Sequence, residues 1–198
     1  MESKIYIIGC GGHARSVADV ILNNDPSVQI IFVDEEAREK EKIFGFPVVR
    51  SLPFKARNLF VAIGDNQKRQ IFSKGKNLIS VISHTATISA SAIIEKGCFI
   101  GEGAHIGPFA HIGTGTIVNT NAVVEHEVQI GSFCHLSSNS TVCGRTKIGN
   151  NVFLGAGATV IDKINICSNV IIGAGSTVVK NINLTGIYVG TPVSLKKG

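Results

Sequence analysis

Residues 100–130 read IGEGAHIGPFAHIGTGTIVNTNAVVEHEVQI, with an aliphatic residue at every sixth position. The spacing extends without an insertion from Ile82 to Val178, and each of the seventeen positions is Ile, Val or Leu. Neither an α-helix nor an ordinary strand has a period of six. This period is typical of a stacked repeat in which each unit directs one aliphatic side chain inward. The positions are Ile82, Ile88, Ile94, Ile100, Ile106, Ile112, Val118, Val124, Ile130, Leu136, Val142, Ile148, Leu154, Val160, Ile166, Ile172 and Val178.

The repeat predicts a triangular prism. Three six-residue faces close one coil of eighteen residues, and seventeen faces form between five and six coils. A second residue, usually small, lies four positions after most of the aliphatic residues, as at Ala104 and Ala122. We expect Gly and Asn at the corners, where they adopt positive φ at little cost. A series of antiparallel strands would instead show period-two alternation and irregular spacing.

Composition sets the remaining limits on the class of protein. The chain of 198 residues has room for one large domain or two small ones, and its net charge is +5. The basic residues are scattered without interleaved aromatics, which argues against nucleic-acid binding but suits an anionic ligand such as a nucleotide or coenzyme A. Five cysteines without a CxxC pair favour reduced thiols and a cytoplasmic protein. We expect no signal peptide, because the N-terminus enters a strand almost at once and has no apolar h-region. We expect no membrane span, because no apolar run approaches eighteen residues.

The chain before the repeat begins with strand, glycine turn, helix and strand. Residues 4–9 are a short apolar strand, and Gly9 opens a glycine turn that ends in a helical pattern. A second apolar run, residues 30–33, stops at Asp34. This order fits the fingerprint G-x-G-x-x-A with an acidic residue about 20 positions later, in which a phosphate lies on the helix N-terminus. A glycine turn that serves packing alone is the alternative.

Only about 80 residues precede the repeat, which is too few for the two halves that a dinucleotide requires. A third run, residues 59–63, ends in Gly64, and residues 66–74 are predicted to be a helix with Ile71 and Phe72 facing inward. We therefore expect an α/β half-Rossmann domain with a parallel sheet over residues 1–80, able to hold one nucleotide. An all-β parallel β-helix of hexapeptide repeats should occupy residues 81–198, including a closing segment near residues 186–192.

The motifs together resemble a known family. A glycine turn with a histidine, VDE at residues 33–35, AIGDNQKR at residues 62–69 and then hexapeptides are similar to the sialic-acid O-acetyltransferases and UDP-4-amino-sugar N-acetyltransferases (NeuD/PglD-like). The resemblance covers essentially the whole chain. It implies a left-handed β-helix, a homotrimer with active sites between subunits, acetyl-CoA as co-substrate, and no metal. It also implies that the N-terminal domain binds a nucleotide-linked amino sugar.

The resemblance assigns the substrate-binding residues by position. Glu35 stands where one branch of the family has Asp, so the base of the nucleotide stays open between uridine, thymidine and guanosine. The predicted substrate-binding residues are Gly11, Gly12, His13, Asp34, Glu35 and Gly64.

Acyl transfer needs a base for the proton of the nucleophile and a donor for the oxyanion. His126 lies between two acids in Glu125-His126-Glu127, and a carboxylate beside an imidazole can hold one ring nitrogen as N–H and leave the other as acceptor. The same E-H-E segment resembles the catalytic segment of the family. We predict that His126 is the general base and that Glu127 orients it. A surface histidine between two solvated acids is the alternative.

The resemblance places acetyl-CoA against residues of the later coils. His135 matches a position near the thioester, and Ala156 and Ala174 match positions where backbone N–H groups meet the pantetheine arm. Gly144, eighteen residues after His126, should lie directly above it in the stack. The predicted cofactor-binding residues are His135, Gly144, Ala156 and Ala174, while His84, His105 and His111 are expected to be stacked repeat positions.

The sequence is compatible with several functions. The preferred one is acetyl-CoA-dependent N-acetylation of a nucleotide-linked 4-amino-4,6-dideoxy sugar for bacterial surface glycans, by direct attack of the amine on the thioester. O-acetylation of a sialic acid would use the same machinery, and a route through an acyl-cysteine at Cys134 or Cys143 lacks an adjacent base. Zinc-dependent hydratases share the prism, but the spacing of His105, His111, His126 and His135 differs from theirs. A non-catalytic sugar-nucleotide-binding protein is the remaining class.

Overall fold

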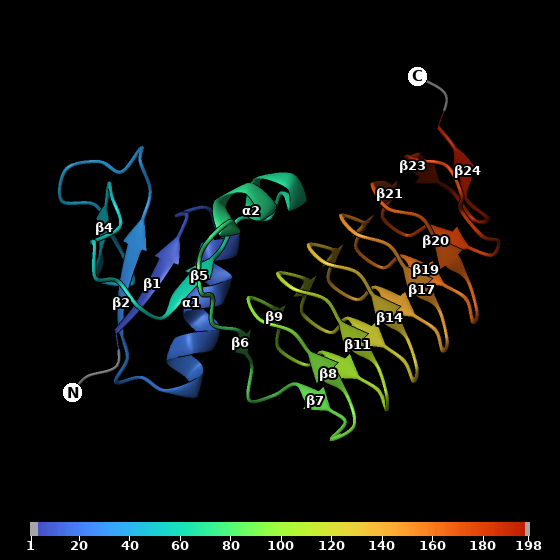
Figure 1. Cartoon of the computed structure of the whole chain (residues 1–198), viewed down its shortest axis with the longest axis horizontal. Helices are drawn as coiled ribbons and strands as arrows, with labels where there is room; N and C mark the ends of the chain where they lie inside the picture. Colours follow the sequence, from blue (N-terminus) through green and yellow to red (C-terminus); the bar gives the residue numbers. More distant parts are fainter. Residues whose placement is uncertain (1–3, 197–198) are drawn as a thin grey trace.

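The computed structural model describes residues 4–196. The outermost residues of both predicted domains, 1–3 and 197–198, lie outside the described residues. An α/β part is followed by a column of stacked coils (Figure 1). Among residues 4–196, none of the helices is long and apolar enough to cross a membrane.

The α/β part is built on a five-stranded sheet of order β3-β4-β2-β1-β5. Strands β4, β2, β1 and β5 are parallel, and β3 adds an antiparallel edge. The order reverses at β1, whose neighbours are β2 on one side and β5 on the other. The elements are β1 (Lys4–Ile8), α1 (Gly12–Asn24), β2 (Gln29–Val33), β3 (Lys42–Ile43), β4 (Phe46–Val49), β5 (Leu59–Val61) and α2 (Asn66–Ser73).

The two helices pack differently from each other. Helix α1 buries the apolar face that its sequence predicts, including Val17 and Ile21. For α2 the prediction was wrong, because Ile71 is 70% exposed and Phe72 is 40% exposed. The buried residues of α2 are Arg69 and Ser73, four positions apart on one helical face. Hydrogen bonds to a row of backbone carbonyls, described below, let the arginine occupy the inward face that apolar residues usually take.

The second part is the predicted parallel β-helix (Figure 1). Each strand pairs in parallel with the strand eighteen residues away, as in His105 with Val123 and Ile106 with Val124. One face is the sheet β7-β10-β13-β16-β19-β22, a second is β8-β11-β14-β17-β20, and the third runs from β6 through β9, β12, β15, β18 and β21. The strands are β6 (Val81–Ile82), β7 (Thr87–Ile88), β8 (Ile93–Ile94), β9 (Phe99–Ile100), β10 (His105–Ile106), β11 (His111–Ile112), β12 (Ile117–Val118), β13 (Val123–Val124), β14 (Gln129–Ile130), β15 (His135–Leu136), β16 (Thr141–Val142), β17 (Lys147–Ile148), β18 (Phe153–Leu154), β19 (Thr159–Val160), β20 (Asn165–Ile166), β21 (Val170–Ile172) and β22 (Thr177–Val178).

The aliphatic positions of the repeat form the axis of the prism. Each is the last residue of its strand, and those from Ile100 to Val178 are buried in one hydrophobic cluster. The residues four positions later, such as Ala104 and Ala122, are also buried and fill the space beside the corners. Close packing of large and small side chains in alternation explains the strict period.

The corners are only partly as predicted. A residue with positive φ recurs every six positions from Gly97 to Gly175, and Gly and Asn occupy most of these positions. Five others carry a larger side chain in the same left-handed conformation, namely Phe109, Glu127, Phe133, Arg145 and Lys163. The glycine that often follows the aliphatic residue has a different role. At Gly107, for example, a Cβ would lie 2.8 Å from the backbone nitrogen of His126 in the next coil.

The last coil is closed by a short hairpin. Strand β23 (Gly186–Val189) pairs in parallel with β21, and β24 (Ser194–Leu195) pairs antiparallel with β23. The hairpin covers the edge that the top of the β21 face would otherwise expose. It contains the closing segment predicted at residues 186–192.

The α/β part packs on the third face of the prism, near its first coils (Figure 1). Phe99 and Ile117 of that face belong to the same buried cluster as Ile7 and Val17 of the α/β part. The side chain of Asn24, at the end of α1, also donates to the carbonyl of Ile82 at 2.6 Å. The shared core fixes the position of the sheet relative to the coils.

Candidate functional site

The first component of the site is a cleft of about 820 Å³ at the carboxyl ends of β1, β2 and β5. It lies at the point where the strand order reverses, where open α/β sheets bind their ligands. All the predicted substrate-binding residues line this one cleft, namely Gly11, Gly12, His13, Asp34, Glu35 and Gly64.

The cleft is suited to a phosphorylated ligand. Helix α1 starts after Gly11, whose lack of a side chain leaves the N-terminal N–H groups of the helix uncapped and open to an anion. Three basic residues that the sequence analysis did not select also line the cleft: Arg50, Lys68 and Lys76. Lys68 lies within the AIGDNQKR motif but was not selected from it, whereas Arg50 and Lys76 lie outside the motifs.

The acidic side of the cleft lies after β2. The side chain of Asp34 accepts a hydrogen bond from the backbone N–H of Glu36 at 3.1 Å, which holds the carboxylate at the mouth of the cleft. Burial, followed by the hydrogen bond with Asp34, raises the pKa of the Cys10 thiol to about 11. Cys10 is therefore a neutral thiol at pH 7 and no ready nucleophile.

The second component is a corner of the prism after β13. The Nδ1–H of His126 donates to Oε2 of Glu127 at 3.0 Å, while Glu127 itself has a φ of 59°. The left-handed backbone turns the carboxylate back toward the preceding imidazole. Nδ1 is thereby the protonated nitrogen, and Nε2 is the acceptor. Both side chains are about half exposed.

Gly144 lies above His126, as the eighteen-residue spacing predicts. A Cβ at position 144 would lie 2.5 Å from Cε1 and 2.6 Å from Nε2 of His126. The imidazole therefore rests against a backbone that has no side chain. Cys143, the neighbour of Gly144, has a pKa raised by burial and by the carboxylates of Glu125 and Asp162.

His135 lies elsewhere, on the face that carries the α/β part. Its Nδ1–H donates to the carbonyl of Gly64 at 3.3 Å, and its ring is 6.3 Å from that of His13. Burial is the main cause that lowers the pKa of His135 to about 4 and that of His13 to about 3. Nε2 of His13 is buried and has no hydrogen-bond partner among the described residues.

Ala156 and Ala174 stack one above the other at the corner between the third face and the β13 face. The carbonyl of Ala156 accepts from Gly175 N–H at 2.8 Å, and both alanines are exposed. Within residues 4–196, neither alanine N–H donates to another backbone group. These amides are therefore free to bind a ligand. One chain does not bring this corner, the cleft and His126 together, because His126 lies at the corner opposite the third face.

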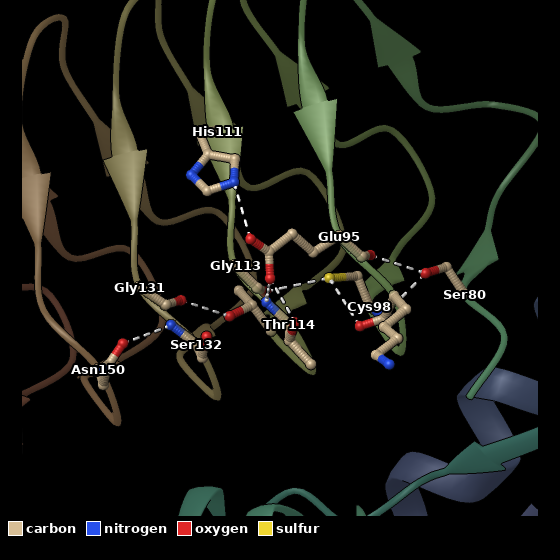
Figure 2. A network of polar contacts seen from close by, with 11 residues as sticks. Ser80, Glu95, Cys98, His111, Gly113, Thr114, Gly131, Ser132 and Asn150 are labelled. Atoms are coloured by element: carbon tan, nitrogen blue, oxygen red, sulfur yellow. Dashed lines mark hydrogen bonds and ion pairs between the residues drawn. The ribbon is translucent and has the colours of Figure 1, made fainter. Parts of the chain in front are cut away.

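A second pairing of histidine and carboxylate lies on the β11 face (Figure 2). Nε2 of His111 lies 3.1 Å from Oε1 of Glu95, whose other oxygen accepts from both the backbone N–H and the hydroxyl of Thr114. The Thr114 bonds are the main cause that lowers the pKa of Glu95. The pair ties successive coils together, which agrees with a stacking role for His111. Among residues 4–196, no group of three or more His, Cys, Asp or Glu is arranged to hold a metal ion.

Comparison with known proteins identifies the family. The PglD N-terminal domain model matches residues 4–75, and the bacterial transferase hexapeptide model matches residues 91–126 and 145–180. The acetyltransferase domain of PglB from Neisseria gonorrhoeae is 30% identical with a TM-score of 0.91, over 98% of this chain and 100% of that chain. This chain belongs to the PglD/NeuD-like family of hexapeptide-repeat acetyltransferases.

Other solved structures are also similar to this chain. GDP-perosamine N-acetyltransferase from Caulobacter crescentus, solved with CoA and GDP-perosamine as a variant in which one histidine is replaced by alanine, is 31% identical. Its TM-score is 0.90, over 99% of this chain and 98% of that chain. WeeI from Acinetobacter baumannii, at 19% identity and a TM-score of 0.76, shares the fold. No curated protein sequence matches the chain.

Proposed function

We propose that the protein transfers an acetyl group from acetyl-CoA to the amino group of a nucleotide-linked 4-amino-4,6-dideoxy sugar used in bacterial surface glycans. The observation that carries the proposal is the combination, in one chain, of a nucleotide-sized cleft and a carboxylate-held histidine. The likeness to an N-acetyltransferase that binds CoA and GDP-perosamine supports the substrate class. In this proposal the two domains have different roles: residues 1–80 bind the sugar nucleotide, and residues 81–198 bind acetyl-CoA and carry the catalytic groups.

In the proposed reaction, His126 is the general base. Its Nε2 accepts a proton from the sugar amine while the nitrogen attacks the thioester carbonyl, so a C–N bond forms. In the proposal, the N–H of Gly144, which donates to no other backbone group within residues 4–196, stabilises the oxyanion. The C–S bond then breaks, and the proton passes to the leaving thiolate to give CoA. Glu127 holds the imidazole in the required tautomer.

The ligands take separate places in the proposal. The sugar nucleotide lies in the cleft, with its phosphates at the N-terminus of α1, its nucleoside near Asp34 and Glu35, and its sugar near His13 and Gly64. The pantetheine arm of acetyl-CoA runs along the free amides of Ala156 and Ala174, and its thioester end approaches His135.

We further propose a homotrimer with the site between subunits. The cleft opens beside the third face, whereas His126 lies at the opposite corner, so the base of one subunit would serve the cleft of its neighbour. A cytoplasmic location fits the use of acetyl-CoA and the free state of all five cysteines, none of which forms a disulfide among residues 4–196.

The test is CoA release from acetyl-CoA, measured by thiol detection, against a panel of nucleotide-linked amino sugars and free sialic acid. Wild type and His126→Ala are compared. Turnover with one amino sugar that falls about 10²–10⁴-fold in the variant supports the proposal. Turnover with sialic acid alone would show that the acceptor is a sialic acid and not an amino sugar. If calorimetry detected no binding of acetyl-CoA, the transferase function would be overturned.

A further inference from the structure

Arg69 is the largest fully buried side chain of the protein, with 1% of its surface exposed. Its guanidinium has no carboxylate within salt-bridge distance among the described residues. All three of its nitrogens nevertheless donate hydrogen bonds, and five of the six acceptors are backbone carbonyls. The acceptors are the carbonyls of Gly115 (2.7 Å), Ile63 (2.9 Å), Gly64 (3.0 Å), Cys134 (2.9 Å) and Phe133 (3.1 Å), and Oδ1 of Asn66 (2.8 Å).

These acceptors come from both parts of the molecule. Ile63 and Gly64 line the nucleotide cleft, while Gly115 and Phe133 occupy stacked corners of two successive coils. One cation therefore joins the end of β5 to the β-helix. A buried guanidinium is tolerated only when its donors are satisfied, and here the dipoles of converging carbonyls take the place of a counter-ion.

The same contact reaches His135, a half-buried residue whose ring lies beside that of His13. The carbonyl of Gly64 accepts from Nη1 of Arg69 at 3.0 Å and from Nδ1–H of His135 at 3.3 Å. His135 is thereby held as the Nδ1–H tautomer, and its Nε2 lies 3.5 Å from the side-chain nitrogen of Asn119. The His13 ring packs edge-on against Phe99 and lines the cleft.

We propose that Arg69 is a positioning residue for acetyl transfer, which holds Gly64 and, through the carbonyl of Gly64, His135 in one fixed arrangement between the nucleotide cleft and the β-helix. The effect of Arg69 on acetyl transfer rests on the proposed function. The fixed position of the residues that Arg69 holds does not depend on it. Arg69 touches neither the cleft nor the His126 corner, so it acts through the residues it holds.

The charge of Arg69 has a second effect. After burial, the guanidinium is the largest cause that lowers the pKa of His135, and for His13 it follows the neighbouring His135. The charged or titratable groups that act on the pair are thus Arg69 and the two imidazoles themselves. Both rings are neutral at pH 7. A neutral His13 ring beside the cleft does not repel a sugar ammonium, as an imidazolium would.

The experiment compares wild type with Arg69→Gln, Arg69→Lys and the control Lys74→Gln, which removes an exposed positive charge beyond the same helix. Imidazole titrations of His13 and His135 are followed by NMR, and KM and kcat are measured for both substrates. In Arg69→Gln we expect the imidazole pKa of His135 to rise, and that of His13 to rise less, because for His13 the guanidinium is the smallest of the three causes that lower the pKa. We also expect KM for the sugar nucleotide to rise about tenfold or more, because Gly64 lines the cleft.

Arg69→Lys separates charge from geometry. Lysine keeps the positive charge but has three donors in place of a planar fork, so the imidazole pKa values should stay low while KM for the sugar still rises. Lys74→Gln should behave as wild type in every readout. Unchanged titration curves in a folded Arg69→Gln protein would overturn the inference.

Failure of Arg69→Gln to fold and failure of the proposed function can each be told apart from failure of the inference. If Arg69→Gln does not fold, ¹⁵N shifts of the wild type decide the matter: His135 must be the Nδ1–H tautomer and stay neutral at pH 5.5. Titration of His135 near its ordinary value would overturn the inference. If the wild type acetylates no sugar, the proposed function fails, while the titrations still test the positioning role.

Discussion

The imidazole of His126 lies against the backbone of Gly144, one coil above it, so that Cε1 is 2.5 Å from where a Cβ would be at position 144. This contact links the eighteen-residue spacing of the coils to the chemistry of the corner. The ring is fixed by Glu127 on one side and by the bare backbone of the next coil on the other. Nε2 is thereby held at one place relative to the N–H of Gly144.

Gly144→Ala should displace the ring without removing it. Because the new methyl group would overlap both Cε1 and Nε2, the imidazole must rotate away from its hydrogen bond with Glu127. We expect kcat to fall about 10²-fold, with KM for the sugar nucleotide little changed. Steady-state kinetics of Gly144→Ala measures the fall in kcat. Cys143→Ala, which only truncates the adjacent side chain, is the control. An alanine variant at 144 with wild-type kcat would show that the position of the ring does not matter.

Two neighbouring residues of α2 offer a matched pair. Phe72 lines the nucleotide cleft, whereas Ile71 lines a separate cavity together with Gln70, Lys74 and Phe133. If the aromatic ring stacks on the nucleobase, Phe72→Ala should raise KM for the sugar nucleotide about tenfold, since base–aromatic stacking contributes about 1–3 kcal/mol. Ile71→Ala should leave KM unchanged. Equal effects of both substitutions would show that the helix only stabilises the fold.

The lowered pKa values of His13 and His135 predict how stability depends on pH. The pKa values of His13 and His135 are lowered from 6.5 to about 3 and about 4, so the unfolded chain binds more protons below pH 6.5. The stabilisation by the neutral rings is complete above pH 6.5 and is lost as pH falls. From pH 6.5 to 4.5, we expect the free energy of unfolding to drop by about 2–3 kcal/mol for each histidine.

Urea unfolding at several pH values measures this slope. His135→Asn removes one of the two titrating rings and should make the curve between pH 6.5 and 4.5 shallower by about half. His84→Asn, which replaces an exposed histidine at the first coil, is the control and should leave the slope unchanged. A wild-type curve that is flat over this range would contradict the lowered pKa values.

The sequence predicts the β-helix well because its period arises from local geometry. Every inward aliphatic residue ends a strand, and the eighteen-residue spacing correctly places Gly144 above His126. The orientation of α2 could not be predicted from a periodic pattern. Its apolar residues, Ile71 and Phe72, face out because Arg69 finds backbone acceptors that lie 46 and more residues further along the chain. Such long-range acceptors leave no periodic pattern in a sequence.

Mixed trimers of two inactive variants can test the assembly. In the proposed trimer, the cleft of one subunit meets His126 of a neighbour, so two inactive variants can complement each other. Gly11→Leu fills the phosphate end of the cleft at a position whose φ of −74° accepts a side chain, and His126→Ala removes the base. Each variant alone should be nearly inactive.

Unfolding the two variants together and refolding them at equal amounts should restore about a quarter of wild-type activity, because a random trimer pairs an intact cleft with an intact base at one interface in four. Mixing the two folded variants without exchange of subunits is the control and should restore nothing. If each site were built from a single chain, the refolded mixture would stay as inactive as its components. Light scattering of the refolded sample should give a mass of three chains, which shows that trimers form again on refolding.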